Sequence, residues 1–441
     1  MRAWTAERIA EAAGARVVEP GRASSGPARA VIDSRHAGPG DLFVGLPGEH
    51  VDGGRFAAGV LGAGAWGVLV DEGWAGVEDP TEAGAILVAA DPLLALQRLA
   101  TAWRRELGAQ VIGVTGSTGK TSTKDLLAAM VDQQRRTVAT PLNLNTEIGL
   151  PLTVLSAPAG TEVLVLEMAM RGAGQIAELA RIAEPDVGVV VNVGPVHLEL
   201  LGTIERIAAT KAELLEGLRP GGTAIVPAGE PLLATHLEVL PDGVSTVTFG
   251  SGGDVSELPD TLEIGVGGRR LSAHMQSNAL AALAAARAVG VEPTGRLEVA
   301  LSGLRGERRE LAGGLVVIDD CYNANPMSMR AALDDLSAST LTPPTRRVAV
   351  LGDMLELGPE EIRFHEEIGA HARAVGVDLL VTVGPLAAHM GPAFGGETVA
   401  VGAAADVVGA VRERLRPGDT ILVKASRGVG LEVVAQELAA A

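Results

Sequence analysis

The feature that most constrains the fold of this sequence is the alternation of apolar strand segments with helical segments through the middle of the chain. The strand segments are apolar on both faces, as in VLVLE and VGVVVNV, which is typical of parallel strands covered by helices on each side. The sequence therefore predicts an α/β protein built on parallel sheets. The predicted strands are 110–115, 162–167 and 186–193, and the predicted helices are 121–132, 175–182, 204–218 and 278–288.

The length of 441 residues allows two or three domains of about 150 residues each. Short apolar runs separated by turn signals, such as DLFVGLPGE and AWGVLV, predict a small α/β module in the first ninety residues. Asp91 and Pro92 then read as the N-cap and first residue of a helix that ends before Gly108. After a glycine-rich, weakly apolar stretch at 250–270, a third α/β run starts near Gly314.

Three domains are therefore predicted, all of them α/β. They are a small N-terminal module at 1–90, a central domain with a parallel sheet at 91–310, and a C-terminal Rossmann-like domain at 311–441. The strands predicted for the last domain are 315–319, 348–351, 379–383 and 420–424.

The composition excludes several classes of partner. Lys and Arg number 36 against 54 Asp and Glu, a net charge of −18, which argues against binding to nucleic acid or to anionic membrane. The single cysteine, Cys321, cannot form a disulfide within the chain or supply a cysteine-rich metal site. The first residues contain no apolar signal core, and the uncharged tract 57–70 is too short to span a bilayer. We therefore expect a soluble cytoplasmic protein.

The segment GVTGSTGKTSTK (113–124) is the sharpest chemical signal, because it follows an apolar strand and opens a helix. Glycines let backbone amides wrap a phosphate, while a lysine meets the terminal phosphates and a threonine hydroxyl reaches Mg²⁺. The first glycine of the standard eight-residue pattern is replaced by Val114, so the shorter G-x-x-G-K-T remains. This motif predicts that the central domain, with its parallel sheet, is like a P-loop ATPase. The predicted nucleotide contacts in this loop are Gly116, Ser117, Thr118, Gly119, Lys120, Thr121 and Ser122.

Two further polar residues follow strands of the same predicted sheet. Glu167 ends VLVLE, and His197 lies just beyond VVVNVGPV. Because parallel strands end at one edge, Thr121, Glu167 and His197 are expected to converge there as a magnesium site. The alternative for Glu167 is a helix cap or an ion pair, and for His197 a loop histidine with its hydrogen bonds satisfied. Lys211, on its own residues, reads as a solvated lysine near two glutamates.

Several segments together resemble the Mur ligases, ATP-dependent amide-forming enzymes of peptidoglycan synthesis related to the folylpolyglutamate synthetases. The central segments are LNTEIGLP (144–151), EMAMRGAGQI (167–176), NVGPVHLELLGT (192–203) and ATKAELL (209–215). DDCYNANPMSM (319–329), GDMLELGPEEIRFHEEIG (352–369) and LVKASRGVGLE (422–432) resemble the branch that adds D-alanyl-D-alanine. DSRHAGPGDLFVGLPGEHVDGGRF (33–56) resembles the uridine-nucleotide module of that branch. The resemblance covers essentially the whole chain.

The resemblance implies a role for each matching residue. Lys120 and Thr121 would contact the phosphates of ATP and Mg²⁺, and Glu167 and His197 would hold magnesium. Lys211 matches a lysine that is carbamylated in this family and becomes a ligand of a second Mg²⁺, which replaces the solvated interpretation. The other implied residues are Asn278, Arg305 and Asp320 for ATP, Asn323 and Lys424 for catalysis, and Ser34, Arg35, Asn145, Thr146, Asn323, Asn325, Asp353, Glu356, Ser426 and Arg427 for the substrates.

The resemblance also implies a reaction. The terminal carboxylate of a UDP-N-acetylmuramoyl-tripeptide would attack the γ-phosphate of ATP, and the amine of D-alanyl-D-alanine would then displace phosphate from the acyl phosphate. The expected partners are these small molecules, and a monomer is expected. The group that assists the incoming amine stays open among Asp320, Asp353, Glu356 and His365. Closure of the domains over the acyl phosphate would keep water away from it.

Four segments depart from the usual family sequences: Asn145-Thr146, Glu167-Met168-Ala169, His274-Met275 and Lys424-Ala425-Ser426. The extra methyl group of Ala169 or Ala425 requires a negative φ or more room than glycine needs. Cys321 lies inside DDCYNANP and is expected to be a small packing residue. Two alternatives remain at this point: a folylpolyglutamate-type ligase, which would lack the N-terminal module, and a nucleotide-switch protein, which would not need His197 or Lys211.

Overall fold

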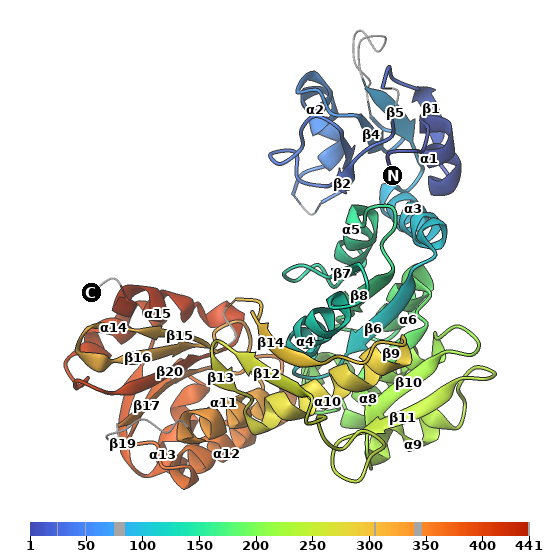
Figure 1. Ribbon diagram of the computed structural model, residues 1–441. Coiled ribbons are helices and arrows are strands. Elements are labelled where there is room, and N and C mark those ends of the chain that lie inside the picture. Colours follow the sequence, from blue (N-terminus) through green and yellow to red (C-terminus); the bar gives the residue numbers. More distant parts are fainter. Residues whose placement is uncertain (24, 49, 75–83, 304–305, 339–345, 440–441) are drawn as a thin grey trace.

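The computed structural model describes residues 1–441 except 24, 49, 75–83, 304–305, 339–345 and 440–441. The described residues form three larger sheets and one small sheet, and Figure 1 shows the N-terminal sheet at the top, the central sheet below it and the C-terminal sheet to the left. Each of the larger sheets is mostly parallel with helices packed on it, so the predicted α/β class is confirmed. No helix in the described ranges is both long and apolar enough to cross a membrane.

The N-terminal sheet has the strand order β1-β5-β4-β3-β2, in which only β1 is antiparallel to its neighbour. Strands β3 and β4 are buried throughout because their residues are apolar apart from Asp41 and Gly67. The elements of this unit are α1 Ala6–Ala13, β1 Arg16–Glu19, β2 Arg29–Val31, β3 Asp41–Val44, α2 Ala57–Gly62, β4 Gly67–Val70 and β5 Ala85–Val88.

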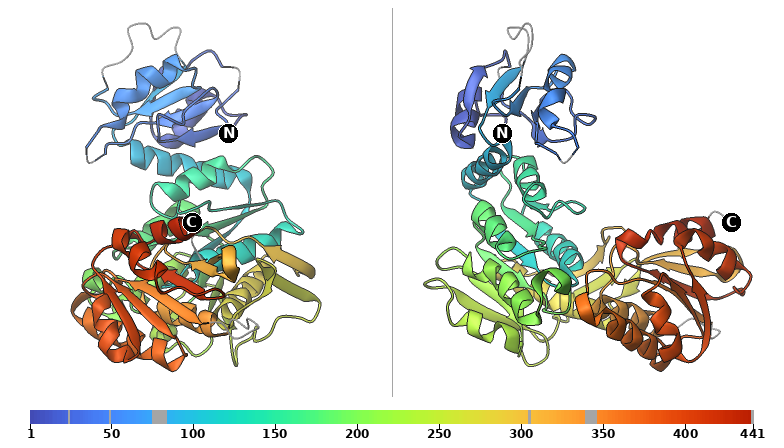
Figure 2. Two further views of the ribbon diagram at one scale, coloured as in Figure 1. Left: turned by 90° about the vertical axis from the view of Figure 1, so that its left-hand side faces the viewer. Right: turned by 180° about the vertical axis from the view of Figure 1, so that it is seen from behind.

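Helix α3, Pro92–Leu107, joins the N-terminal sheet to the rest of the molecule, as both views of Figure 2 show. Its predicted boundaries are confirmed: the Asp91 side chain accepts a hydrogen bond from the Leu94 N–H, and Gly108 adopts the left-handed conformation after the last turn. Trp103 on this helix packs edge-to-face against Trp4, with 5.4 Å between ring centroids. The aromatic contact fixes the beginning of the chain against α3.

The central sheet is entirely parallel, with the order β11-β10-β9-β6-β8-β7. The predicted strand 110–115 is confirmed, and the predicted strand 186–193 is shorter because the chain leaves the ladder after Val190. The elements are β6 Gln110–Thr115, α4 Lys120–Asp132, β7 Thr137–Ala139, α5 Gly149–Ser156, β8 Val163–Glu167, α6 Gln175–Ala183, β9 Val187–Val190, α7 Leu198–Leu201, α8 Ile204–Glu216, β10 Thr223–Pro227, α9 Ala234–Leu237 and β11 Ser245–Phe249.

Helix α10 packs on one face of the central sheet, and a small sheet, β13-β12-β14, contacts the neighbouring helix α4 through β14. The glycine-rich stretch 250–270 thus contains two strands, although its weak apolar pattern predicted none. Helix α10 begins at Ala273, five residues before the predicted start at 278. The elements are β12 Leu262–Val266, β13 Arg269–Arg270, α10 Ala273–Ala288 and β14 Gly295–Val299.

The C-terminal sheet has the order β15-β16-β20-β17-β18-β19, with only β15 antiparallel, and apolar residues cover both faces. Strand β15 lies before residue 311, where we expected this domain to begin, and pairs with β16. The elements are β15 Glu307–Glu310, β16 Val316–Asp319, α11 Pro326–Ala338, β17 Arg347–Gly352, α12 Glu361–Ala374, β18 Leu379–Val383, α13 Met390–Phe394, β19 Glu397–Val401, α14 Ala404–Arg412, β20 Thr420–Lys424 and α15 Glu432–Ala439.

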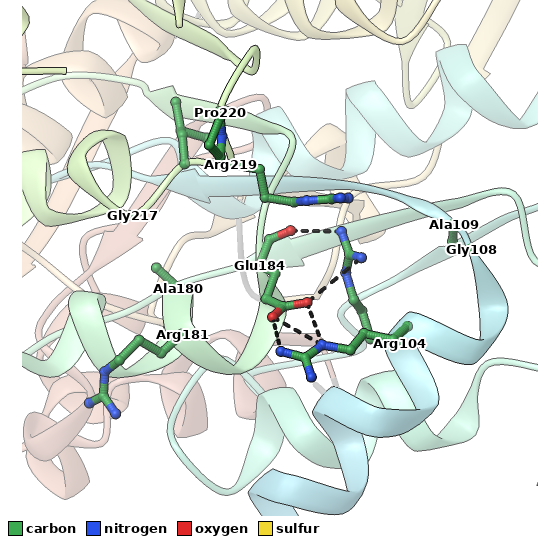
Figure 3. A pocket seen from close by; sticks show the side chains of 11 residues that line it. Arg104, Gly108, Ala109, Ala180, Arg181, Glu184, Gly217, Arg219 and Pro220 are labelled. Carbon is green, nitrogen blue, oxygen red and sulfur yellow. Dashed lines mark hydrogen bonds and ion pairs between the residues drawn. The ribbon is translucent and has the colours of Figure 1, made fainter. Parts of the chain in front are cut away.

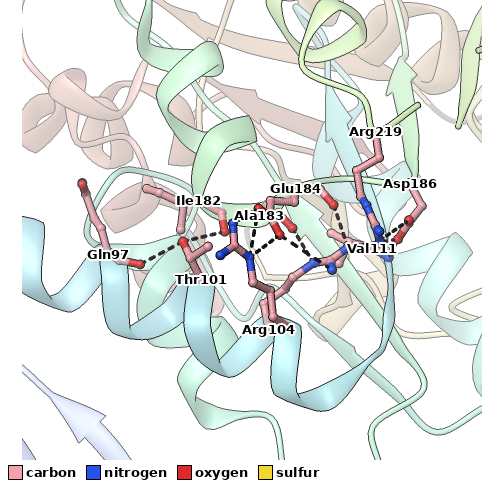
Figure 4. A network of polar contacts seen from close by, with 10 residues as sticks. Gln97, Thr101, Arg104, Val111, Ile182, Ala183, Glu184, Asp186 and Arg219 are labelled. Carbon is pink, nitrogen blue, oxygen red and sulfur yellow. Dashed lines mark hydrogen bonds and ion pairs between the residues drawn. The ribbon is translucent and has the colours of Figure 1, made fainter. Parts of the chain in front are cut away.

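A polar network around Arg104 fastens α3 to the central sheet (Figure 4). The Arg104 side chain is only 5% exposed, and its guanidinium donates to the carbonyls of Ala183 at 2.9 Å and Glu184 at 2.7 Å and contacts Asp186 at 3.3 Å. Asp186 also accepts the N–H of Val111 at 2.8 Å. The network therefore supplies hydrogen-bond donors to the carbonyls at the end of α6, and it fixes the first residues of β6 through Asp186.

The same arginine lines a hollow of about 720 Å³ with Arg105, Arg181 and Arg219 (Figure 3). The hollow lies at the amino-terminal edge of the strands, opposite the glycine-rich loop. Glu184, Asp186 and the carboxyl ends of α3, α6 and α8 place negative charge around it, which balances the four arginines. The hollow is accordingly a structural feature of this edge.

Replacing Arg104 by Met is expected to lower the free energy of unfolding of the central unit by about 2–4 kcal/mol, because it removes a buried cation that bonds two carbonyls and a carboxylate. Denaturant unfolding followed by the fluorescence of buried Trp103 measures this change. Arg181→Met is the matched control, since Arg181 is an exposed arginine in the last turn of α6 and should change stability by less than about 0.5 kcal/mol. Equal effects of the two substitutions would contradict the role of the network.

Candidate active site

The glycine-rich loop connects β6 to α4 at the carboxyl edge of the central sheet. Gly119 has a φ of +76° and no side-chain cap covers the first turn of α4, so the amides of that turn face the loop. The Lys120 ammonium donates to the Gly116 carbonyl at 2.8 Å, and Thr121 is 1% exposed. The segment therefore has the geometry of an anion-binding helix N-terminus.

Asn278 on α10 packs against this loop. It is 5% exposed, and a Cβ atom at Gly119 would come within 2.6 Å of Asn278 Oδ1. Glycine is therefore favoured at 119 for two reasons, the positive φ and the close approach of the Asn278 amide. The structure thus places the predicted adenine contact next to the phosphate loop.

Glu167 ends β8 and meets two of the predicted residues. Its carboxylate accepts from Thr121 Oγ1 at 2.7 Å and from Asn145 Nδ2 at 2.7 Å, and the side chain is 1% exposed. Because Mg²⁺ prefers oxygen ligands in an octahedral arrangement, the Thr121 hydroxyl and the Glu167 carboxylate fit it. Within the described ranges, no group of three His, Cys, Asp or Glu side chains is close enough to hold a metal by itself.

His197 begins α7 with a φ of +53°, and its ring contacts Glu356 through Nδ1. Glu356, which also has a positive φ, contacts Arg171 at 2.6 Å. Burial lowers the pKa of His197 despite the neighbouring carboxylate, with the charges of Lys120 and Lys211 acting in the same direction. The loop of the C-terminal unit that carries Glu356 therefore contacts His197, the histidine predicted to bind magnesium.

Lys211 on α8 is 1% exposed and has no hydrogen bond or ion pair with the described residues. Burial lowers its pKa well below the usual value, and the charge of Lys120 lowers it further. The solvated interpretation from the residues alone is wrong. Glu213, expected beside it, accepts instead from the amides of Gly174 and Ala177. The tertiary packing buries the lysine, which local sequence could not show.

Lys424 ends β20 at the edge of the C-terminal sheet and is 2% exposed. Its ammonium donates to Asp320 Oδ2 at 2.7 Å and to the Asn323 carbonyl at 2.9 Å. The Asn323 side chain is exposed, and its Oδ1 accepts the N–H of Ala324. Cys321, in the same segment, is 1% exposed, and burial raises the pKa of its thiol. The predicted residues of this segment therefore surround one buried ammonium.

Three predicted substrate residues bind the protein's own backbone. Asn325 Oδ1 accepts from the Ser328 N–H at 2.9 Å at the start of α11, an N-cap arrangement. The Ser426 hydroxyl accepts the N–H of Leu355 at 3.0 Å. Asp353 Oδ1 accepts the N–H of Ala387 at 2.7 Å. These side chains shape the loops at the carboxyl edge of the C-terminal sheet, and exposed Arg427 lies over the ring of Tyr322 at 5.6 Å.

His365 was one of four candidates for assisting the amine. It is fully buried, its Nε2 accepts the N–H of Met354 at 3.0 Å, and its Nδ1 contacts the Glu361 carbonyl at 2.6 Å. Burial lowers the pKa of the imidazole. With both ring nitrogens bonded to backbone, His365 supports the turn that carries Glu356 and has no nitrogen left to accept a proton.

The N-terminal candidates lie after β2. Arg35 is exposed and its guanidinium binds Asp33 at 2.9 and 2.6 Å, which holds the pKa of that carboxyl well below its usual range. Ser34 is half-buried beside it, and Thr146, on the loop after β7, is exposed. Arg305 lies outside the described residues. The departures at Ala169 and Ala425 are accommodated, because neither residue has a positive φ.

Sequence reasoning missed three residues at this edge, Asn192, Gly194 and Arg171. Asn192 Oδ1 accepts the amides of Ser117 and Thr118, and Gly194 exchanges two hydrogen bonds with Ser117. A polar residue directly after an apolar strand of a parallel sheet was the available signal for Asn192. Arg171 gave no such signal, because its partner, Glu356, is 185 residues away.

The fold and this geometry define a class of protein. It is an α/β protein with a phosphate-binding loop at one edge of its central sheet, and its C-terminal unit contacts that same edge. The sequence matches two protein families, described as "Mur ligase middle domain" over residues 114–286 and "Mur ligase, glutamate ligase domain" over residues 304–427. The chain belongs to the Mur ligase family.

Relatives match along almost the whole chain. The UDP-N-acetylmuramoyl-tripeptide--D-alanyl-D-alanine ligase of Bacillus subtilis is 39% identical over 429 residues, covering 92% of each chain. A crystal structure of MurF from Acinetobacter baumannii has a TM-score of 0.83 at 28% identity and covers 99% of both chains. The MurF ligase of Thermotoga maritima in complex with ADP has a TM-score of 0.78 at 30% identity, with 92% of this chain and 96% of that chain covered.

Gly119→Ala is expected to weaken binding of ADP about tenfold or more, because the new Cβ would meet Asn278 in addition to the strain of a positive φ. Isothermal titration of the purified protein with ADP and MgCl₂ measures the affinity. The matched control is Gly174→Ala, whose φ of +83° carries the same strain but whose Cβ would meet no atom within 4 Å. An affinity loss of the same size in the control would assign the effect to strain alone.

Proposed function

We propose that this protein is an ATP-dependent ligase that joins D-alanyl-D-alanine to a UDP-N-acetylmuramoyl-tripeptide through an acyl phosphate and releases ADP and phosphate. The named relatives support the choice of substrates, since they match along more than nine-tenths of the chain. The proposed domain ranges are 1–90 for the UDP-sugar substrate, 91–310 for ATP and 311–441 for the incoming dipeptide. The proposed site of action is the cytoplasm, and the proposed state is a monomer.

The observation that carries the ligase chemistry is Lys211, a buried amine that makes no hydrogen bond or ion pair with the described residues and is close enough to Lys120 and His197 to interact with them electrostatically. A lowered pKa makes the neutral amine easier to form, and only a neutral amine can add to carbon dioxide to form a carbamate. A solvated lysine would stay charged. We therefore propose that Lys211 carries a carbamate, which changes the charge at this position from positive to negative.

The residues proposed to hold Mg²⁺ are Thr121, Glu167, His197 and the carbamate of Lys211, with two ions in all. The hydroxyl, the carboxylate and the carbamate supply the oxygen atoms that magnesium prefers. Bound magnesium would neutralise charge on the phosphates of ATP. Only Nδ1 of His197 contacts Glu356, so Nε2 could bind the metal while the carboxylate orients the ring.

The loop amides and Lys120 are proposed to hold and orient the phosphates for attack by the substrate carboxylate. Phosphoryl transfer depends mainly on positioning and on neutralising charge, which these groups provide without themselves reacting. Asn278 would hold the adenine, and Arg305 and Asp320 would complete the nucleotide contacts. Ser34 and Arg35 are proposed to contact the uridine nucleotide, and Asn145 and Thr146 the peptide.

The C-terminal unit is proposed to present the amine of D-alanyl-D-alanine. Lys424 and Asn323 lie at its edge, with Asp353, Glu356, Ser426 and Arg427 around the same cluster of loops. Lys424 is a buried cation that could stabilise negative charge developing on the acyl phosphate. Of the four candidates for assisting the amine, Glu356 contacts His197 and Arg171 of the central unit and Asp320 accepts from Lys424. His365, in contrast, bonds backbone through both ring nitrogens.

The activity is tested by ADP release in three mixtures: ATP with UDP-N-acetylmuramoyl-tripeptide and D-alanyl-D-alanine, ATP with tetrahydrofolate and glutamate, and ATP alone. We expect stimulation only in the first mixture, since the N-terminal unit has no counterpart in a folate ligase. Both meso-diaminopimelate and L-lysine tripeptides should be supplied. Slow ADP release that no substrate stimulates would instead favour a nucleotide switch.

Lys211→Ala is expected to lower kcat about 100-fold, or about 2.7 kcal/mol of transition-state stabilisation, and added acetate should restore part of it by entering the space of the carbamate. Lys211→Met is the control, because its side chain fills that space and should not respond to acetate. A carbamate signal in the ¹³C NMR spectrum of wild-type protein with labelled bicarbonate, absent from both variants, gives a readout independent of activity. Unchanged activity of Lys211→Ala would exclude the carbamate.

A further inference from the structure

Asn192 lies in the turn that follows β9, beside the loop that follows β6. The two strands pair up to their ends, with Thr115 opposite Val190, and the Val191 N–H donates to the Thr115 carbonyl at 2.8 Å. The backbone ladder therefore carries Asn192 directly against the phosphate loop. The proposed function gives this residue no role.

Every polar atom of the Asn192 side chain binds the loop. Oδ1 accepts the N–H of Ser117 at 3.1 Å and of Thr118 at 3.0 Å, while Nδ2 donates to the Thr118 carbonyl at 3.0 Å. The backbone carbonyl of Asn192 also accepts from the Ser117 N–H at 3.1 Å. A flipped amide would turn its NH₂ group toward two N–H donors, so only one orientation is compatible with these contacts.

These contacts divide the amides of the loop into two groups. Ser117 and Thr118 donate to Asn192 and shape the loop, while the amides that follow Gly119 open the first turn of α4, where no side chain caps the helix. The first turn of a helix has no intrahelical acceptor for its amides and favours negative charge. Asn192 thus sets which amides of the loop are left to a phosphate.

The brace continues to a residue of the C-terminal unit. The Ser117 hydroxyl, on a side chain only 6% exposed, donates to the Gly194 carbonyl at 2.9 Å and accepts the Gly194 N–H at 2.8 Å. A Cβ atom at Gly194 would come within 1.9 Å of the sulfur of Met327, on the first turn of α11. Met327 therefore packs directly on the glycine that holds the loop.

We propose that Asn192 is a positioning residue that presets the phosphate loop for nucleotide, and that Met327 couples the placement of the C-terminal unit to this loop through Gly194. The inference rests on the proposed function only in that the loop binds ATP. Nucleotide affinity would then depend on the Asn192 side chain, which binds the backbone of the loop. It would also depend on the packing of the Met327 side chain against Gly194.

The first test measures ADP affinity by titration in MgCl₂ for Asn192→Ala and Asn192→Asp. Alanine removes all three side-chain bonds, and we expect affinity to fall about tenfold. Aspartate keeps both accepted bonds but loses the donated one and places a negative charge beside the phosphates, so its affinity should fall further. A purely structural role predicts the reverse order, because aspartate preserves more of the contacts than alanine does.

The matched control is Gln133→Ala at the other end of α4. Gln133 also clamps backbone through both ends of its amide, donating to the Thr294 carbonyl at 2.8 Å and accepting the Thr294 N–H at 3.2 Å. Its loss should leave ADP affinity unchanged. Wild-type affinity in both Asn192 variants would overturn the inference, whereas failure of the wild-type protein to bind ADP would count against the proposed function itself.

The second test is a double-mutant cycle between Gly194→Ala and Met327→Ala. The methyl group in Gly194→Ala collides with the Met327 sulfur, and we expect kcat of the ligase reaction and ADP affinity to fall about tenfold. Truncating Met327 in that background makes room and should restore most of the loss. If Gly194→Ala lowered kcat and ADP affinity equally in the wild-type and Met327→Ala backgrounds, the coupling would be overturned. Thermal unfolding of each variant, recorded without nucleotide, separates misfolding from either result.

Discussion

The backbone ladder that holds β8, β6 and β9 parallel is the constraint on which the whole candidate site depends. It places Val114 opposite Glu167 and Thr115 opposite Val190. Because the three strands run in one direction, the residues that leave them meet at one edge of the sheet. The glycine-rich loop alone would be a turn. Next to Glu167 on one side and Asn192 on the other, it has a defined shape and a carboxylate within hydrogen-bond distance.

The buried ionisable groups of the candidate site are stabilised to different degrees. Glu167 accepts bonds from a hydroxyl and an amide, and Lys424 donates to a carboxylate and a carbonyl. Lys211 lacks such compensation within the described part of the chain, so its charged form is costly. A group in that position lowers its free energy by losing its charge, which makes its chemical modification physically reasonable. The net charge of −18 says nothing about these local groups.

Much of the central sheet could be predicted, because its strands are uniformly apolar and its loops carry glycine and proline signals. The convergence of Thr121 with Glu167 also followed from strand ends alone. The small sheet was missed because its strands are short and weakly apolar. Asn325, Ser426 and His365 could be matched to motifs, but only the structure showed that their polar atoms bind neighbouring backbone. Hydrogen bonds of that kind depend on loop geometry, which motifs do not encode.

The sequence by itself determined the α/β class, the phosphate loop and the order of the units, since these depend on periodicity and on local backbone chemistry. Tertiary structure decided the burial of Lys211, the contact of His197 with Glu356 and the brace of Asn192. Each of these joins residues from separate elements, up to 159 positions apart, or depends on what packs above a helix face. No local pattern carries that information, because the environment of a side chain is set by the elements that fold against it.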